Sequence, residues 1–381
     1  MSDLKAPRKG FLGASREKVE MTAGSGNAGR QTARATRLKV DEDGTIHVPA
    51  FKLPLSGALS PEARSTQIAG LRSQFGLPSF ENASNEEEFV ALAQESRRVI
   101  DEMFLIPLSK ALLSAFPVEI AKDQLGGVPV ETFTPPRQKA PRRVLINLHG
   151  GGFFTGAVHG GRVESIPVAA LGEVKIVSVD YRQGYEHRYP AATADVASVY
   201  KSLLADHAPS EIGIYGGSAG GRLTAQALAW ILNEGLPPPA AAGIFGSGAG
   251  GDGDAAYFGK IGVAETAPPP HLPAEILPAQ FRSREFGYFA GVPVDDPMVT
   301  PINAPKELLA KFPPTLFITA TRAFDLSPAI LFHRALVRAG AEASLHVFDG
   351  FGHCFYYNAF LPEAQDAYAT IVGFFDRHLA T

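Results

Sequence analysis

The segment around Ser218 constrains the fold of this chain more than any other part of its sequence. The apolar run from Glu211 to Tyr215 is typical of a β-strand, and a helical pattern follows from Arg222 to Leu232. Between them lies G-G-S-A-G, whose glycines let the backbone turn sharply and adopt a strained conformation at the serine. We therefore predict a strand, a tight turn and a helix, with the Ser218 hydroxyl raised above the edge of a sheet, as a nucleophile requires.

A second glycine-rich motif, H-G-G-G-F at residues 149–153, follows another apolar strand pattern from Arg143 to Leu148. Acyl transfer through a tetrahedral intermediate needs donors aimed at the developing oxyanion, and glycines let bare N–H groups approach it. We expect the N–H groups of Gly151 and Gly152 to serve in this way, with a third from Ala219. A glycine-rich turn that merely redirects the chain is the alternative.

A base for the serine is offered by His353 in D-G-F-G-H-C-F, which follows the strand-like run from Ser344 to Phe348. A histidine in a late loop fits the chain order nucleophile, acid, histidine. A histidine in a turn can also be an ordinary surface or core residue. The neighbouring Cys354, the only cysteine of the chain, is interpreted as a small packed residue because Ser218 already has the turn and the oxyanion motif.

With these motifs the chain resembles the hormone-sensitive-lipase-like carboxylesterases of the α/β-hydrolase superfamily, from about Leu125 to the C-terminus. The stretch from Val179 to Asp195 is similar to another family segment, although Tyr185 stands where that segment usually has proline. The resemblance implies an α/β fold with a doubly wound, mostly parallel sheet. It also implies a serine carboxylesterase that hydrolyses apolar or aromatic carboxylic esters, with a small-molecule ester as its partner.

The acid of the expected triad is where the chain departs from the family. In T-R-A-F-D-L-S at residues 321–327, Ala323 stands at the acid position and Asp325 follows two residues later. Three explanations stay open: an engineered replacement of Asp by Ala, a transfer of the role to Asp325, and a natural loss of the triad. Asp325 could instead cap the next helix. A catalytically disabled protein that binds a hydrophobic ester or acid is therefore one alternative function. An acyltransferase is another, because acyl transfer to an alcohol differs from hydrolysis only in the nucleophile that enters the site.

Composition excludes other classes of function. The 381 residues are 45% hydrophobic with a net charge of −4, which gives no bias toward nucleic acid or an anionic membrane. The single cysteine excludes internal disulfides, and the sequence contains neither a membrane-span pattern nor a metal motif. We expect no cofactor, no metal, no nucleic-acid partner, no membrane span and a cytoplasmic location, and leave a homodimer open.

One rival motif, G-S-G-A-G-G from Gly246 to Gly251, matches the dinucleotide-binding pattern after a strand. Such a site also needs a helix directly afterwards and an acidic residue about twenty positions on. A proline-rich stretch, Pro268 to Pro270, follows instead. We interpret this segment as a wall of the substrate pocket.

Three regions are expected along the chain: a flexible N-terminal arm at residues 1–39, a helical cap at 40–124 and the catalytic domain at 125–381. Within the cap, apolar residues at helical spacing predict helices from Ser60 to Phe75 and from Asn85 to Phe104. Beyond Gly126, buried apolar runs alternate with amphipathic ones. They predict strands near residues 128–133, 144–148, 175–179, 212–215, 242–245, 315–319 and 344–348.

Overall fold

The computed structural model describes residues 39–42, 46–47, 54–73, 83–250, 286–293 and 295–380. The chain divides into two compact units, residues 1–52 and 53–381. In the first unit, β1 (Lys39–Val40) pairs with β2 (Ile46–His47) in a short antiparallel ribbon. The predicted arm lies outside the described residues apart from Lys39.

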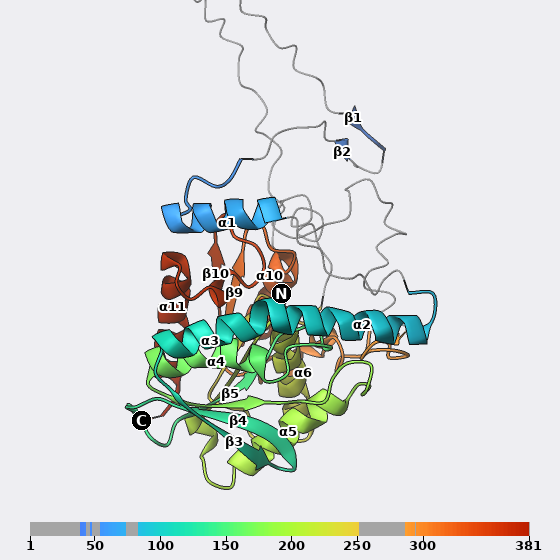
Figure 1. The fold of residues 1–381 in the computed structure, drawn as a ribbon. Helices are drawn as coiled ribbons and strands as arrows, with labels where there is room; N and C mark the ends of the chain where they lie inside the picture. Colours follow the sequence, from blue (N-terminus) through green and yellow to red (C-terminus); the bar gives the residue numbers. More distant parts are fainter. Residues whose placement is uncertain are drawn as a thin grey trace, which may run out of the picture. The chain divides into compact units, whose positions relative to one another are not determined.

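The second unit contains an eight-stranded sheet with the order β10-β9-β8-β7-β5-β6-β4-β3 (Figure 1). The six strands from β10 to β6 are parallel, and β4 and β3 continue the sheet with antiparallel pairing. The strands are β3 (Glu119–Leu125), β4 (Val128–Thr134), β5 (Val144–Leu148), β6 (Lys175–Val179), β7 (Ile212–Gly217), β8 (Ala241–Phe245), β9 (Thr315–Ala320) and β10 (Ala343–Phe348). The predicted mostly parallel sheet is confirmed, and all seven predicted strands lie within it.

The strand β3 was not predicted. It is the edge strand of the sheet and its residues are mostly exposed. The sequence therefore contains no buried apolar run that would predict it. Gly126 and Gly127 link it to β4 with φ angles of 57° and 82°, which are the positive angles that a two-residue hairpin turn favours. The sheet therefore begins at Glu119.

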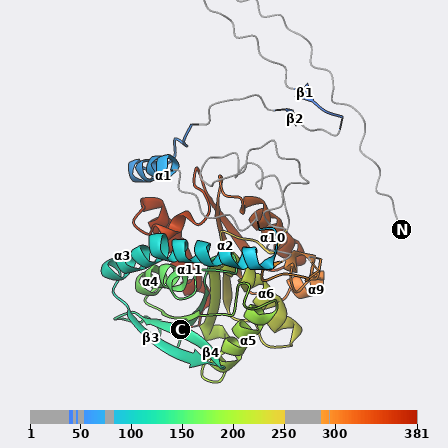
Figure 2. The same ribbon diagram turned by 45° about the vertical axis from the view of Figure 1, so that its right-hand side comes forward.

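Helices cover both faces of the sheet (Figures 1 and 2). One apolar cluster joins alternate strand residues, such as Ile146 and Ile214, to α5 (Ala191–Leu203), α6 (Ala219–Asn233) and α10 (Leu326–Ala339). The other cluster joins the intervening residues, such as Leu145 and Tyr215, to α4 (His159–Gly172) and α11 (Pro362–His378). This alternation along each strand produces a core on either side. Short helical segments lie at η3 (Pro209–Glu211), η5 (Pro301–Asn303), α9 (Lys306–Leu309) and η6 (Phe355–Tyr357).

The helices predicted before the sheet are present within a few residues of their expected bounds. They are α1 (Pro61–Ser73) and α2 (Glu86–Ile100), where the Asn85 side chain caps the first turn by accepting from the Glu88 N–H at 2.9 Å. A π-helical segment, η2 (Asp101–Leu105), joins α2 to α3 (Ile106–Ala115), so the three form one long helical run (Figure 1). The run packs on α4 through α3 and η2.

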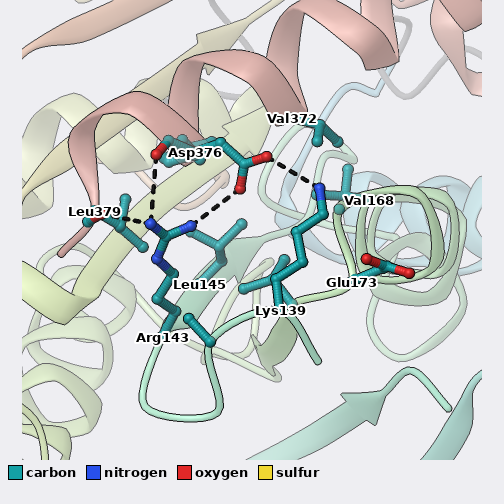
Figure 3. A pocket seen from close by; sticks show the side chains of 12 residues that line it. Lys139, Arg143, Leu145, Val168, Glu173, Val372, Asp376 and Leu379 are labelled. Carbon is teal, nitrogen blue, oxygen red and sulfur yellow. Dashed lines mark hydrogen bonds and ion pairs between the residues drawn. The ribbon is translucent and has the colours of Figure 1, made fainter. Parts of the chain in front are cut away.

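A pocket lined by Lys139, Arg143 and Asp376 lies where α11 crosses the start of β5 (Figure 3). Arg143 donates to Asp376 Oδ1 at 3.0 Å and to the Leu379 carbonyl at 2.8 Å, and Lys139 donates to Asp376 Oδ2 at 3.1 Å. These bonds fasten the last helix to the sheet. The pocket lies at the amino end of β5, whereas the candidate nucleophile follows the carboxyl end of β7.

Among the helices of the described residues, none has the length and apolar character that crossing a membrane requires.

Candidate active site

Ser218 lies between β7, which ends at Gly217, and α6, which begins at Ala219. Its φ and ψ angles are 53° and −121°, a strained conformation for a residue with a side chain. The following turn needs glycine, because a Cβ at Gly220 would lie 1.8 Å from the Leu148 carbonyl oxygen. The predicted strand, sharp turn and helix are therefore present.

Three side chains from separate loops meet at this turn. His353 Nε2 lies 2.8 Å from Ser218 Oγ, and His353 Nδ1 lies 2.6 Å from Asp325 Oδ1. Thr319 donates a hydrogen bond of 2.5 Å to the other oxygen, Asp325 Oδ2. The carboxylate orients the imidazole so that Nε2 faces the serine hydroxyl, which is the arrangement a general base requires.

The carboxylate that contacts His353 is at position 325 and not at position 323, where the family pattern expects it. Ala323 is buried, with 1% of its surface exposed, and Asp325 is 2% exposed. Asp325 occupies the N-cap position of α10, yet its side chain makes no capping hydrogen bond and points to His353 instead. The alternative that the Asp325 side chain caps α10 is therefore wrong.

Asp325 stabilises the positive charge that develops on the His353 ring when Nε2 accepts a proton. Burial alone would lower the pKa of the imidazole, but the Cys354 sulfur and the Asp325 carboxylate outweigh it and raise the pKa well above the usual 6.5. Cys354 is itself buried, with its sulfur 3.5 Å from His353 Nε2. A site of this kind stabilises the imidazolium that forms when the histidine accepts a proton.

The glycines expected to bind the oxyanion form a tight loop after β5. Gly151 and Gly152 have φ angles of 122° and 63°, and a Cβ at Gly151 would lie 2.1 Å from the Thr155 carbonyl oxygen. Among the described residues, neither glycine N–H donates to a protein acceptor. Ala219, the third expected donor, is the first residue of α6, where N–H groups have no partner within the helix.

His149 is buried beneath the loop of oxyanion glycines and contacts it. Burial lowers the pKa of His149 to about 4, so its ring is neutral at pH 7, and it stacks on Tyr181 with the ring centres 4.3 Å apart. Its Nδ1 donates to the Gly150 carbonyl at 2.7 Å. This role was not predicted, because the motif alone does not tell a buried histidine from an exposed one.

Two further residues of the site carried no sequence signal. Glu164, in α4, accepts hydrogen bonds from the N–H groups of Gly150 and Gly217 at 2.8 and 3.1 Å. Arg97, in α2, donates to the Phe154 carbonyl at 2.7 Å and forms a two-bond ion pair with Glu186. A single glutamate or arginine within a helical pattern does not indicate which loop it contacts.

The glycine-rich segment that starts at Gly246, which matches the dinucleotide-binding pattern, lies beside the histidine of the site. Gly246 has a φ of 56°, and a Cβ there would lie 2.7 Å from Cys354 Sγ and 3.3 Å from His353 Cε1. The residue at position 246 therefore has to be small so that the histidine loop can pack against β8. Gly251, the last glycine of the motif, lies outside the described residues.

Within the described part of the chain, no group of three or more His, Cys, Asp or Glu side chains could hold a metal ion.

Sequence comparison identifies the class of protein. The profile of the α/β-hydrolase fold family matches residues 145–357, more than half of the chain and the whole span from β5 to the histidine loop. The chain belongs to this family. Within it, the chain is a member of the hormone-sensitive-lipase-like carboxylesterases, as its motifs predict.

Individual relatives agree with this placement. A putative acetyl-hydrolase, LipR of Mycobacterium tuberculosis, is 30% identical over 65% of this chain and 77% of its own length. An esterase of Acinetobacter venetianus is 26% identical over 71% of this chain and 87% of its own. Among solved structures, esterase E25 matches with a TM-score of 0.72 and 26% identity, over 88% of this chain and 99% of its own.

Proposed function

We propose that Ser218, His353 and Asp325 form the catalytic triad of this carboxylesterase. The proposal is supported chiefly by the continuous contact from Asp325 Oδ1 through His353 to Ser218 Oγ, with distances of 2.6 and 2.8 Å. Asp325 then takes the role that the family pattern assigns to position 323, and the chain needs no carboxylate there.

The reaction proceeds in two halves. His353 Nε2 accepts the proton of Ser218 while Oγ attacks the ester carbonyl, and the N–H groups of Gly151, Gly152 and Ala219 bind the oxyanion. His353 then donates the proton to the leaving alcohol. Water, activated by the same histidine, releases the acid from the acyl-enzyme. Asp325 stabilises the imidazolium in both halves without accepting its proton.

The substrate class that we propose is small apolar or aromatic esters. Phe324 supports it, because its ring lies 4.4 Å from the His353 ring and 41% of its surface is exposed. An exposed aromatic face beside the base favours an apolar group of the substrate. The name of one relative, a putative acetyl-hydrolase, agrees with a short acyl group.

A fluorophosphonate probe tests the nucleophile. The parent protein is expected to be phosphonylated at Ser218, and Ser218→Ala to lose both labelling and about 10⁶ in kcat on p-nitrophenyl butyrate. Ser247→Ala is the matched control, since Ser247 also follows a strand within a glycine-rich turn. Labelling that persists in Ser218→Ala would contradict the proposal.

Two further expectations stay proposals: the helical cap over the site and a cytoplasmic location. Cell fractionation tests the location. The hydrogen bond from Arg97, in α2, to the Phe154 carbonyl supports the cap.

A further inference from the structure

Glu164 is a buried acidic residue that the proposed reaction does not use. Only 3% of its surface is exposed, and its carboxylate accepts four hydrogen bonds. A buried carboxylate is costly unless its hydrogen bonds are complete. The identity of the donors therefore indicates what the residue does.

The donors come from the segments that form the site. Gly150, whose N–H donates at 2.8 Å, directly precedes the oxyanion glycines. Gly217, whose N–H donates at 3.1 Å, directly precedes Ser218. Tyr357, whose hydroxyl donates at 2.5 Å, lies four residues after His353, and Asn147 of β5 completes the set at 2.9 Å.

The two glycines leave room for this carboxylate and phenol. A Cβ at Gly217 would lie 2.9 Å from Glu164 Oε1 and 2.9 Å from the Tyr357 hydroxyl. A Cβ at Gly150 would lie 2.7 Å from the same hydroxyl. The backbone of both loops thus packs directly on the Glu164–Tyr357 pair.

Four donors surround the two oxygens of the buried carboxylate. The two backbone N–H groups can only donate, and the Asn147 amide nitrogen donates because Asn147 Oδ1 accepts from Ser178 at 2.8 Å. Burial raises the pKa of Glu164 above its usual range, and these hydrogen bonds offset only part of that effect. With both oxygens occupied by donors, neither loop can shift without leaving a buried carboxylate oxygen unpaired.

We propose that Glu164 is a positioning residue for ester hydrolysis, whose carboxylate holds the Gly150–Gly152 loop against the Gly217–Ala219 turn. N–H groups from these two segments have to converge on one oxygen, so their relative position decides how well the oxyanion is bound. The inference rests on the proposed function. It assigns to Glu164 and Tyr357 a role in the transition state rather than in substrate binding.

A positioning role of this kind predicts a change in kcat without a change in KM. The oxyanion exists only in the transition state, so misplaced donors lower kcat and leave KM nearly unchanged. Glu164→Gln keeps the shape of the side chain but places an NH₂ group opposite at least one donor. We expect kcat on p-nitrophenyl butyrate to fall about 10- to 100-fold, since a misplacement of about 1 Å costs up to about 10²-fold.

Tyr357→Phe is the second variant, because it removes one donor and keeps the carboxylate and the aromatic packing. Its kcat is expected to fall about three- to tenfold with the same KM. Glu131→Gln is the matched control, since Glu131 is also buried, at 6% exposure, and accepts both its bonds from Arg162 of the same helix α4. It should lower the melting temperature without changing kcat.

All rates are divided by the active sites titrated with a fluorophosphonate probe. A parent that neither labels nor hydrolyses the ester would overturn the proposed function. With an active parent, an unchanged kcat in folded Glu164→Gln would overturn the role of Glu164. If Glu164→Gln does not fold, an unchanged kcat in Tyr357→Phe overturns the inference, and a loss of kcat at constant KM supports it.

Discussion

Phe324 and Asp325 are neighbours in the chain that contact different parts of the His353 ring. Asp325 is buried and bonded to Nδ1, whereas Phe324 lies against the ring and is 41% exposed. The same short loop therefore supplies the charge that orients the base and an apolar surface beside it. This surface is available to the acyl or alcohol group of an ester.

At this scale we predict that Phe324→Ala reduces the preference for aromatic esters. Contact with one aromatic face is worth about 1 kcal/mol, or about fivefold in kcat/KM. The ratio of kcat/KM for phenyl acetate over methyl acetate should fall by that factor, and taking the ratio cancels any general effect on His353. Phe360→Ala, at an exposed phenylalanine packed near Phe116 rather than near His353, is the control. An unchanged ratio would exclude Phe324 from the substrate site.

The acid was the site residue least open to prediction. Motif spacing placed the expected carboxylate at position 323, and the sequence alone left the role of Asp325 undecided. The choice depends on how the residues after β9 turn, and the Asp325 carboxylate is held by Thr319 of β9 itself and by His353 of the loop after β10. Contacts of this kind between distant segments are not encoded in local spacing.

At the scale of elements, Arg97 links the helix α2 to the loop that contains the oxyanion glycines. Arg97 donates to the Phe154 carbonyl at 2.7 Å, and both its terminal nitrogens bind Glu186 at 2.7 and 3.0 Å. Phe154 is two residues after the last oxyanion glycine. The helix α2 is thus tied to the loop whose geometry the reaction needs, which supports the proposed cap at this place.

We predict that Arg97→Lys lowers kcat about tenfold, because lysine cannot make the forked contact to the carbonyl and the carboxylate together. Arg98→Gln is the matched control: this adjacent arginine pairs with Glu95 and Glu102 within its own helical run. Steady-state kinetics on p-nitrophenyl butyrate compares the two. Equal kcat in Arg97→Lys and the parent would show that α2 does not influence the loop.

The elements themselves were largely predictable. Buried parallel strands such as β5 and β7 are continuous apolar runs, so their bounds follow from the sequence within about two residues. The edge strand β3 alternates polar and apolar residues weakly and was missed. Glu164 was missed for a related reason, because its partners lie on β5, β7 and η6 and only the folded sheet brings them together.

At the scale of the whole molecule, the sheet order explains how the site is assembled. The strands β5, β7, β8 and β9 are neighbours, although β5 and β9 lie more than 160 residues apart in the chain. The carboxyl ends of such parallel strands lie at one edge, where the loops collect. The oxyanion loop, the Ser218 turn and the Asp325 loop all leave the sheet at that edge, and the His353 loop follows β10 there.

The central claim is that Asp325 completes a working triad in a chain that has alanine at position 323. The most direct measurement is kcat on p-nitrophenyl butyrate for Asp325→Asn and for Ala323→Asp, each per titrated active site. Asp325→Asn should lower kcat by about 10⁴, since the His353 tautomer and its protonated form lose their support. Ala323→Asp should give no gain. A fully active Asp325→Asn, or a gain of about 10³ or more from Ala323→Asp, would contradict the account.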